Sequence, residues 1–278
     1  MDWEGLSDEQ VAILVASILG DGEITKCYPY DRRVNNSYRE HFGMGQLSYR
    51  QWKQQKLSNL LYLRGNNLVS RSIPLMTKIF PLFYPNNKKH IPFELLKDIH
   101  HPSFLLTLYL DDGSLLLSKR FNHDKKEIQF TPHIAFYLQA FSRHQLEQLA
   151  TWMKARYDIN VRTSGTPSGT GYYLKTTKVT DTFDILNLFE PYIAELPDFI
   201  YKLSWGTRLQ TEVETYKQTH PDYKIRVSIP ARPYSDEDIA LLINWKQQGV
   251  TDKEIARRLN RTYWSVVYKW QDVKNREA

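Results

Sequence analysis

Two aspartates, Asp21 and Asp112, are the residues of this 278-residue sequence whose type and setting could do chemistry together. Each is followed by glycine, and each ends an apolar stretch, LVASILGDG at 14–22 and LLTLYLDDG at 105–113. The last carbonyl groups of a helix carry partial negative charge, so two carboxylates placed at two adjoining helix ends would repel each other. A hard divalent cation such as Mg²⁺ relieves this repulsion, because it takes carboxylate and carbonyl oxygens as ligands and keeps bound water. Paired carboxylates with Mg²⁺ suit phosphodiester hydrolysis.

Both apolar stretches predict helices that position these acids. Ser7 and Gln10 have capping-box spacing, so the first helix should begin near Asp8 and end at Gly22. Small residues would let the two helices approach closely and place Asp21 beside Asp112; these are Ala16, Gly20 and Thr107.

The segments after the two aspartates also share a plan, which predicts two repeats at about 7–100 and 101–205. In the first repeat we expect strands near 24–28 and 41–47, a helix near 50–63 and short strands as far as residue 80. In the second we expect strands near 114–121 and 128–139, a helix near 143–157, a hairpin over 159–178 and a helix near 180–188.

The two motifs resemble those of the LAGLIDADG homing endonucleases in their single-chain, two-repeat form. The likeness covers about residues 7–205. The run NNKKHIP at 86–92 lies just before the second motif, as a similar run does in monomeric members of the family. PYI at 191–193 and YKL at 201–203 resemble the end of the family's second repeat.

This resemblance implies an α+β fold, a pseudo-twofold pair of αββαββα repeats whose sheets form a saddle on DNA. It also implies cleavage of both strands across the minor groove, with 3′ overhangs. By position, the metal-binding acids would be Asp21 and Asp112, helped by the carbonyls of Gly20 and Asp111; Mn²⁺ could replace Mg²⁺. The active-site lysines would be Lys89 and Lys202, which polarise water or stabilise phosphate charge, and the flanking polar residues would be Gln46 and Gln139.

The sequence departs from the motif at two positions. Leu19 stands at the sixth position of the first copy, and Asp111 stands at the seventh position of the second, where a small residue is common. Asp111 leaves two candidate acids, and we favour Asp112 because it directly precedes glycine. Without the resemblance, both candidate lysines could equally be solvated surface charges.

Beyond the repeats, residues 206–234 begin helix-compatible and end rich in proline and basic residues, which predicts an extended tether. Residues 235–278 predict three short helices that begin at Ser235, Thr251 and Thr262, the pattern of a helix-turn-helix module. The third helix would place side chains against base edges, and the arginines before it would hold phosphates; the expected contacts are Arg257, Arg258, Arg261, Tyr263, Trp264 and Lys269. A small helical bundle for protein contacts is the alternative.

Composition fits a soluble DNA-binding protein. The formal net charge is +6, and 18 Tyr and 7 Trp accompany the basic residues. The longest uncharged apolar run, 11–20, is too short to span a bilayer and does not have the flanks of a secretion signal. The single cysteine, Cys27, excludes an intrachain disulfide. We expect a monomer without a membrane partner, in a bacterial or phage-infected cytoplasm or in an organellar matrix.

The sequence therefore predicts a site-specific, Mg²⁺-dependent endonuclease acting on double-stranded DNA. The alternative is a binder on the same scaffold that does not cut, either a maturase that binds intron RNA or a transcription regulator. A binder has no need for both acids. We do not expect an intein-embedded enzyme, because the chain has neither a Cys or Ser at its start nor a terminal His-Asn.

Overall fold

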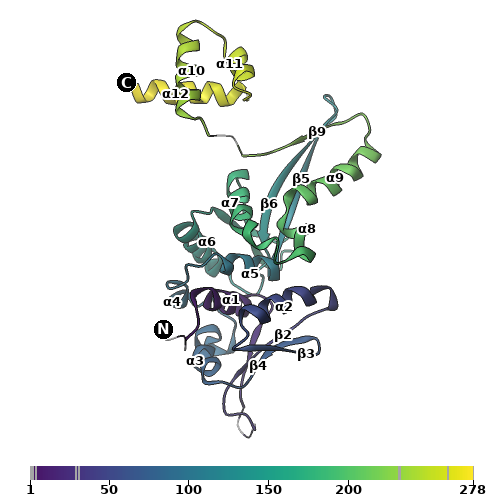
Figure 1. Ribbon diagram of the computed structural model, residues 1–278, viewed down its shortest axis with the longest axis vertical. Coiled ribbons are helices and arrows are strands. Elements are labelled where there is room, and N and C mark those ends of the chain that lie inside the picture. Colours follow the sequence, from purple (N-terminus) through teal and green to yellow (C-terminus); the bar gives the residue numbers. More distant parts are fainter. Residues whose placement is uncertain are drawn as a thin grey trace. The chain divides into compact units, whose positions relative to one another are not determined.

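Two helices without a polar face form the centre of the protein's first unit. In the computed structural model, which describes residues 3, 5–28, 30, 32–230, 233–261 and 263–277, the chain divides into Met1–Pro230 and Ala231–Ala278. Helices α1 (Asp8–Leu19) and α5 (Ser103–Asp112) pack against each other at the junction of the two repeats (Figure 1). Residues 11–19 of α1 and 103–110 of α5 are all buried, as an apolar helix requires. The capping box of Ser7 and Gln10 is present, and α1 ends three residues earlier than expected.

The first repeat has the expected αββαββα order, with shifted boundaries. Its sheet is antiparallel with strand order β1-β2-β4-β3. Its elements after α1 are β1 (Glu23–Thr25), β2 (Ser37–His41), α2 (Leu47–Lys56), β3 (Leu61–Arg64), β4 (Asn67–Ser70) and α3 (Pro74–Phe83).

Three expectations for the first repeat were wrong. The second strand covers Ser37–His41 rather than 41–47. Its buried side chains are those of Tyr38 and Glu40, which alternate with exposed ones as in a half-buried strand. The helix expected at 50–63 covers 47–56. The last segment before residue 80 is the helix α3, which Pro74 begins at a position where a missing N–H costs nothing.

The second repeat confirms the predicted order closely. Its elements after α5 are β5 (Gly113–Asn122), β6 (Glu127–Phe136), α6 (Arg143–Tyr157), β7 (Val161–Gly165), β8 (Tyr172–Thr176) and α7 (Val179–Phe189). Short helices connect these parts: η1 (Met44–Gln46), η2 (Pro85–Asn87), α4 (Phe93–Leu96), η3 (Glu190–Tyr192), η4 (Pro197–Phe199) and α8 (Ile200–Leu203). The fold is α+β, as expected from the resemblance.

The segment 206–234 is not the extended tether that its prolines predicted. It continues as α9 (Trp205–Thr219) and β9 (Lys224–Val227), and β9 pairs in parallel with β6. Aromatic rings hold this segment on the first unit: the Tyr216 ring centroid lies 5.9 Å from that of Phe121 and 5.7 Å from that of Phe130. The first unit therefore extends to Pro230.

The second unit consists of three helices, α10 (Asp236–Gln247), α11 (Asp252–Arg258) and α12 (Tyr263–Glu277). Ser235 and Thr251 cap the first two, as predicted, and Thr262, the expected start of the third, lies outside the described residues. The core of the unit is small and consists of Leu242, Ile255, Ala256, Leu259 and Val266. Among the residues that the structure describes, none of the helices has the length and apolarity needed to cross a membrane.

Candidate active site at the paired helix ends

The C-terminal ends of α1 and α5 bring the predicted acids to one place. The backbone N–H of Asp21 faces the Asp111 carboxylate, with the nitrogen 3.5 Å from Oδ2. Lys89 and Lys202 both lie in the field of all three acids, Asp21, Asp111 and Asp112. The two repeats therefore contribute to a single charged centre.

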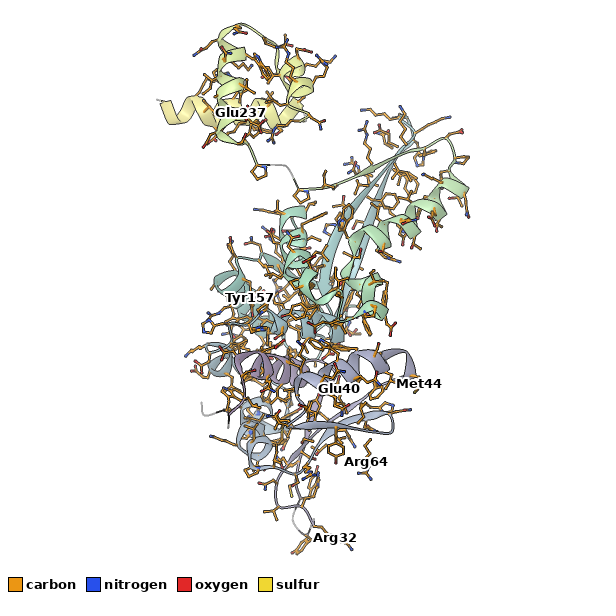
Figure 2. The ribbon with its side chains drawn as sticks, viewed as in Figure 1. Arg32, Glu40, Met44, Arg64, Tyr157 and Glu237 are labelled. Atoms are coloured by element: carbon orange, nitrogen blue, oxygen red, sulfur yellow. The ribbon has the colours of Figure 1, made fainter. Side chains whose placement is uncertain are left out.

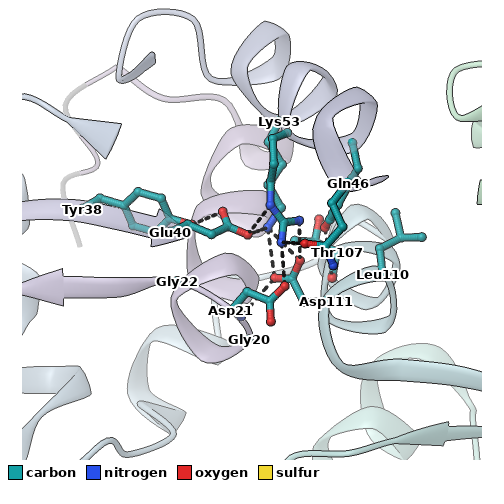
Figure 3. A network of polar contacts seen from close by, with 12 residues as sticks. Gly20, Asp21, Gly22, Tyr38, Glu40, Gln46, Lys53, Thr107, Leu110 and Asp111 are labelled. Atoms are coloured by element: carbon teal, nitrogen blue, oxygen red, sulfur yellow. Dashed lines mark hydrogen bonds and ion pairs between the residues drawn. The ribbon is translucent and has the colours of Figure 1, made fainter. Parts of the chain in front are cut away.

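Asp111 extends from the second repeat into a buried ion-pair network of the first (Figure 3). Its Oδ1 lies 2.8 Å from Lys53 Nζ and 3.4 Å from Arg50 Nη1, and all three side chains are fully buried. Gly20 makes this contact possible, because a Cβ on residue 20 would lie only 2.6 Å from Asp111 Oδ2. Asp111 thus replaces the small residue common at its motif position and holds α5 against the first repeat.

Glu40 completes this network from β2, inside the first repeat (Figure 2). Its Oε1 lies 2.8 Å from Lys53 Nζ and 3.0 Å from Arg50 Nε, and Tyr38 Oη donates a 2.6 Å hydrogen bond to its other oxygen. Burial raises the pKa of Glu40, although Lys53 opposes the rise. Burial works against the charge of Arg50, but Asp111 and Glu40 outweigh it and raise the pKa of the guanidinium. The buried acids and the buried cations of this network therefore stabilise each other in their charged forms.

Asp21 lies at the edge of the network, where it meets solvent. Arg50 Nη2 lies 2.6 Å from Asp21 Oδ2, and the Asp21 side chain keeps 29% of its exposure. A cavity of about 550 Å³ opens beside it; the cavity is lined by Asp21, Gly22, Glu23, Arg39, His41, Asn67, Tyr84 and Lys89. One oxygen of Asp21 is therefore oriented by Arg50 while the group remains accessible.

Asp112 has a different environment from Asp111. Burial, and then the negative charges of Asp111 and Asp21, raise the pKa of Asp112 to about 7. In the described part of the chain, its carboxylate makes no hydrogen bond or ion pair; only its backbone carbonyl is engaged, accepting a 2.6 Å bond from the N–H of Tyr137. Lys89 and Lys202 compensate the charge of Asp112 only in part, because neither ammonium group bonds to the carboxylate.

The two predicted lysines cap the two helix ends. Lys89 Nζ donates to the carbonyls of Gly20 at 2.7 Å and of Gly22 at 3.2 Å. Lys202 Nζ donates to the carbonyl of Leu110 at 2.8 Å. Burial lowers the pKa of both amines, against the raising influence of the acids. Each lysine thus compensates carbonyl groups that have no partner within the helix.

The two predicted glutamines have unequal positions. Gln46 joins the network, because its Oε1 accepts a 3.3 Å hydrogen bond from Arg50 Nη2. Gln139 is exposed and lies beside Gly171, and among the described residues it makes no hydrogen bond to the acids. The structure therefore brings only Gln46 into contact with the charged centre.

Two sets of oxygens could hold a cation here. Asp21, Glu40 and Asp111 offer carboxylate oxygens within 4.8 Å of one another. Arg50 and Lys53 already lie among these oxygens, so the set is largely neutralised. Asp112, the predicted partner of Asp21 in a metal site, is not part of this set; among the described residues, its mostly buried carboxylate has no cation within hydrogen-bonding distance.

The basic side chains predicted to bind DNA in the second unit differ in availability. Arg257 and Arg258 pair with Glu254 at 2.7 and 2.9 Å but keep 74% and 39% of their exposure. The Arg261 side chain is only 4% exposed and pairs with Asp238 at 2.7 Å, so little of it lies on the surface where the predicted DNA contact would form.

The remaining predicted contacts lie on α12. Lys269 pairs with Asp272 at 2.9 Å and is 18% exposed, whereas Tyr263 is 47% exposed. The side chain of Trp264 lies outside the described residues. The accessible candidates among the described side chains are thus Arg257, Arg258 and Tyr263.

The sequence interpretation missed the buried cations Arg50 and Lys53 and their partner Glu40. Two signals could have found them. Glu40 alternates with the apolar Tyr38 on a strand, so both face the core. Arg50 and Lys53 are three residues apart, which puts them on one helix face beside the apolar Tyr49 and Trp52.

Comparisons with known proteins show the family of this chain. The family profile described as the LAGLIDADG DNA endonuclease family matches residues 11–182. The protein RecA of Mycobacterium shimoidei is 27% identical over 207 residues, 71% of this chain and 47% of that protein. The protein RecA of Mycolicibacterium chitae is 26% identical over 209 residues, with the same two coverages. The chain thus spans about half the length of these relatives.

A solved structure shares the fold. The homing endonuclease I-WcaI bound to its DNA recognition sequence superposes with a TM-score of 0.55. The match covers 72% of this chain and 88% of I-WcaI, at 20% sequence identity. At this identity, the likeness establishes the architecture of the two repeats.

Proposed function

Because this chain belongs to the LAGLIDADG DNA endonuclease family, we propose that it is a site-specific endonuclease that makes a staggered double-strand break in a long DNA target. The observation that carries the proposal is the state of Asp112. Its carboxylate is mostly buried, has a raised pKa and lies at the same centre as Asp21, and no cation of the described residues is within hydrogen-bonding distance of it. A group in this state is stabilised by a bound metal ion.

Mg²⁺ is the proposed metal, and Mn²⁺ should substitute for it. Asp21 and Asp112 would hold it, with the carbonyls of Gly20 and Asp111 as additional oxygen ligands; the Gly20 carbonyl keeps a second lone pair beside its bond to Lys89. When bound, the metal supplies activation of water and stabilisation of the attacked phosphate.

The chain's own residues position the reactants. Arg50 orients one oxygen of Asp21 through the 2.6 Å ion pair. Lys89 and Lys202 place one positive charge at each helix end, where a phosphate of each DNA strand would accumulate negative charge. Gln46 fixes Arg50 from the neighbouring turn.

Double-stranded DNA is the proposed partner, and the second unit is proposed as an additional DNA-binding module. The net charge of +6 and the DNA-bound state of the I-WcaI structure support this partner. Arg257, Arg258 and Tyr263 would contact the duplex from this unit. Its covalent attachment to the first unit would raise the affinity by local concentration. We propose a monomer that acts in a bacterial or phage-infected cytoplasm, or in an organellar matrix.

One observation favours a second candidate, a nucleic-acid binder that does not cut. Arg50 already neutralises Asp21, so the first acid does not need a metal to be stable. A maturase bound to intron RNA and a transcription regulator are the two forms of this candidate.

Binding and cleavage can be separated in one experiment. The Asp112→Asn variant of the full chain is used to select duplexes from a randomised DNA library, and the wild-type protein is then incubated with the selected duplexes in Mg²⁺, Mn²⁺ or EDTA. We expect both strands to be cut in either metal, with 3′ overhangs, and no cleavage in EDTA. Selection of a defined sequence that wild type leaves intact would establish the second candidate instead. An Asp112→Asn variant that cuts as fast as wild type would contradict the assigned role of this residue.

A further inference from the structure

Strand β9 adds a row of side chains to the sheet of the second repeat. Its residues pair in parallel register with β6: Glu127 with Lys224, Ile128 with Ile225, Gln129 with Arg226 and Phe130 with Val227. The backbone N–H of Ser228 also donates to the carbonyl of Phe130 at 2.8 Å. Since β5 pairs along the whole of β6 and β8 reaches only residues 135 and 136, β9 occupies the part of the second edge that β8 leaves open.

One face of this three-stranded region is covered by α9. Ile128 and Phe130 are fully buried, and Phe130 contacts Tyr216 of α9. Lys119, which pairs with Phe130 across the sheet, lies 2.7 Å from Glu212 of the same helix. Since side chains alternate along a strand, the residues between these point to the opposite face.

The opposite face carries basic and amide side chains in register. Arg120 of β5, Gln129 of β6 and Arg226 of β9 are paired across three strands, so the two arginines flank the glutamine at about 10 Å from each other. Lys224 occupies the next row, beside Glu127. Arg120, Lys224 and Arg226 are all exposed.

The charge of this face is predominantly positive. Along the described strands of the second sheet, the residues of this face include Arg120, Arg162, Lys175, Lys224 and Arg226, and a single carboxylate, Glu127. Arg226 Nη2 lies 2.9 Å from Glu127 Oε1, yet the Arg226 side chain remains 62% exposed. Arginine and glutamine offer paired hydrogen-bonding groups that match base edges in the major groove, which is wide enough for a β-ribbon.

We propose that β9 is a DNA-contacting strand, and that Arg226 and Lys224 extend the surface with which the second repeat binds its half of the target. This inference rests on the proposed function, because it requires a duplex on this face. It assigns a specificity-determining role to a segment that follows the last element of the repeat. The occupant is duplex DNA, which combines a phosphate backbone for the lysine with base edges for the arginine.

The Arg226–Glu127 pair allows a test of whether DNA affinity follows the charge of this face. The Arg226→Gln and Glu127→Gln variants each break the ion pair, but they change the charge of the face in opposite directions. We expect Arg226→Gln to weaken binding to the selected duplex by about 5- to 100-fold and to relax base preference at the outer end of one half-site. Glu127→Gln should bind as tightly as wild type or more tightly. Lys217→Gln, on the exposed surface of α9, removes the same charge away from this face and should change affinity by less than about 2-fold.

The outcomes separate this inference from the proposed function. If wild type selects and cuts a duplex while Arg226→Gln and Lys224→Gln behave as Lys217→Gln does, the β9 inference is wrong and the endonuclease assignment stands. If both partners of the ion pair weaken binding equally and both lower the unfolding temperature, the pair is structural and the inference is also wrong. If wild type binds no duplex at all, the proposed function itself fails.

Discussion

The carboxylate of Asp111 lies against Gly20, which holds the same position of the motif in the other helix. A Cβ at position 20 would lie 2.6 Å from Asp111 Oδ2. The two helix ends are therefore complementary rather than equivalent: one supplies a charged side chain, and the other supplies the space that it enters.

The Gly20→Ala variant should lose about 1–3 kcal/mol of unfolding free energy, because Asp111 cannot move away without breaking its bonds to Lys53 and Arg50. Urea-induced unfolding of the first unit measures the change. Gly43→Ala is the matched control, since Gly43 has φ −82° and open space around a Cβ. Equal stability of the two variants would contradict the tight packing.

The two adjacent acids should respond oppositely to replacement by asparagine. Asp111→Asn leaves Lys53 and Arg50 buried with less compensating charge, so it should destabilise the protein by about 3–5 kcal/mol. Asp112→Asn removes a mostly buried carboxylate whose charge is opposed by burial and by Asp111 and Asp21 more than it is favoured by the lysines, so stability at neutral pH should be unchanged or higher while DNA cleavage is lost. Chemical unfolding and a plasmid cleavage assay measure the two properties. A stable Asp111→Asn protein would show that Asp111 has no structural role.

Replacement of a single lysine should slow the cleavage of one DNA strand more than the cleavage of the other. Lys89 lies at the end of α1 and Lys202 at the end of α5, so each serves one strand in the proposed mechanism. Lys89→Met or Lys202→Met should slow cleavage of one strand by about 10²-fold or more, so that a supercoiled plasmid carrying the target accumulates as the nicked form. Equal slowing of both strands would indicate that the lysines act only by holding the helix ends.

Replacement of two arginines of the second unit should have different effects, one on the stability of the unit and the other on DNA binding. Arg261→Met breaks a nearly buried pair with Asp238 and should lower the unfolding free energy of this unit by about 1–3 kcal/mol. Arg257→Gln, at a side chain that is 74% exposed, should leave stability within about 0.5 kcal/mol and weaken DNA binding. Circular dichroism melts and DNA titrations distinguish them. A large loss of stability in Arg257→Gln would contradict the assignment of Arg257 to the surface.

Local patterns were sufficient for much of the fold. The helices α1, α5 and α6 were predictable, because capping residues or uninterrupted apolar runs mark them. The turn at Gly43–Gln46 and the helix after Pro74 were missed, because short mixed segments are compatible with strand and helix alike. Strand β9 was missed because its stability comes from pairing with β6, almost 100 residues earlier in the chain.

In the candidate site, too, features set by neighbouring residues were predictable and features set by distant residues were not. The position of Asp21 and Asp112 at two helix ends could be read from their own neighbours in the sequence. The role of Asp111 could not, because Lys53 and Arg50 come from the other repeat, 58 and 61 residues away. The burial of Arg261 was likewise decided by Asp238, in a different helix.

The unequal contact between Gly20 and Asp111 also determines which halves can assemble. A dimer of two first repeats would bring two Gly20 ends together and leave two sets of Arg50 and Lys53 without one of the acids that neutralise them. A dimer of two second repeats would force two Asp111 carboxylates into a space that accommodates one. Each half thus excludes a copy of itself as a partner, so these two repeats cannot be separated into symmetric dimers without redesign of this contact.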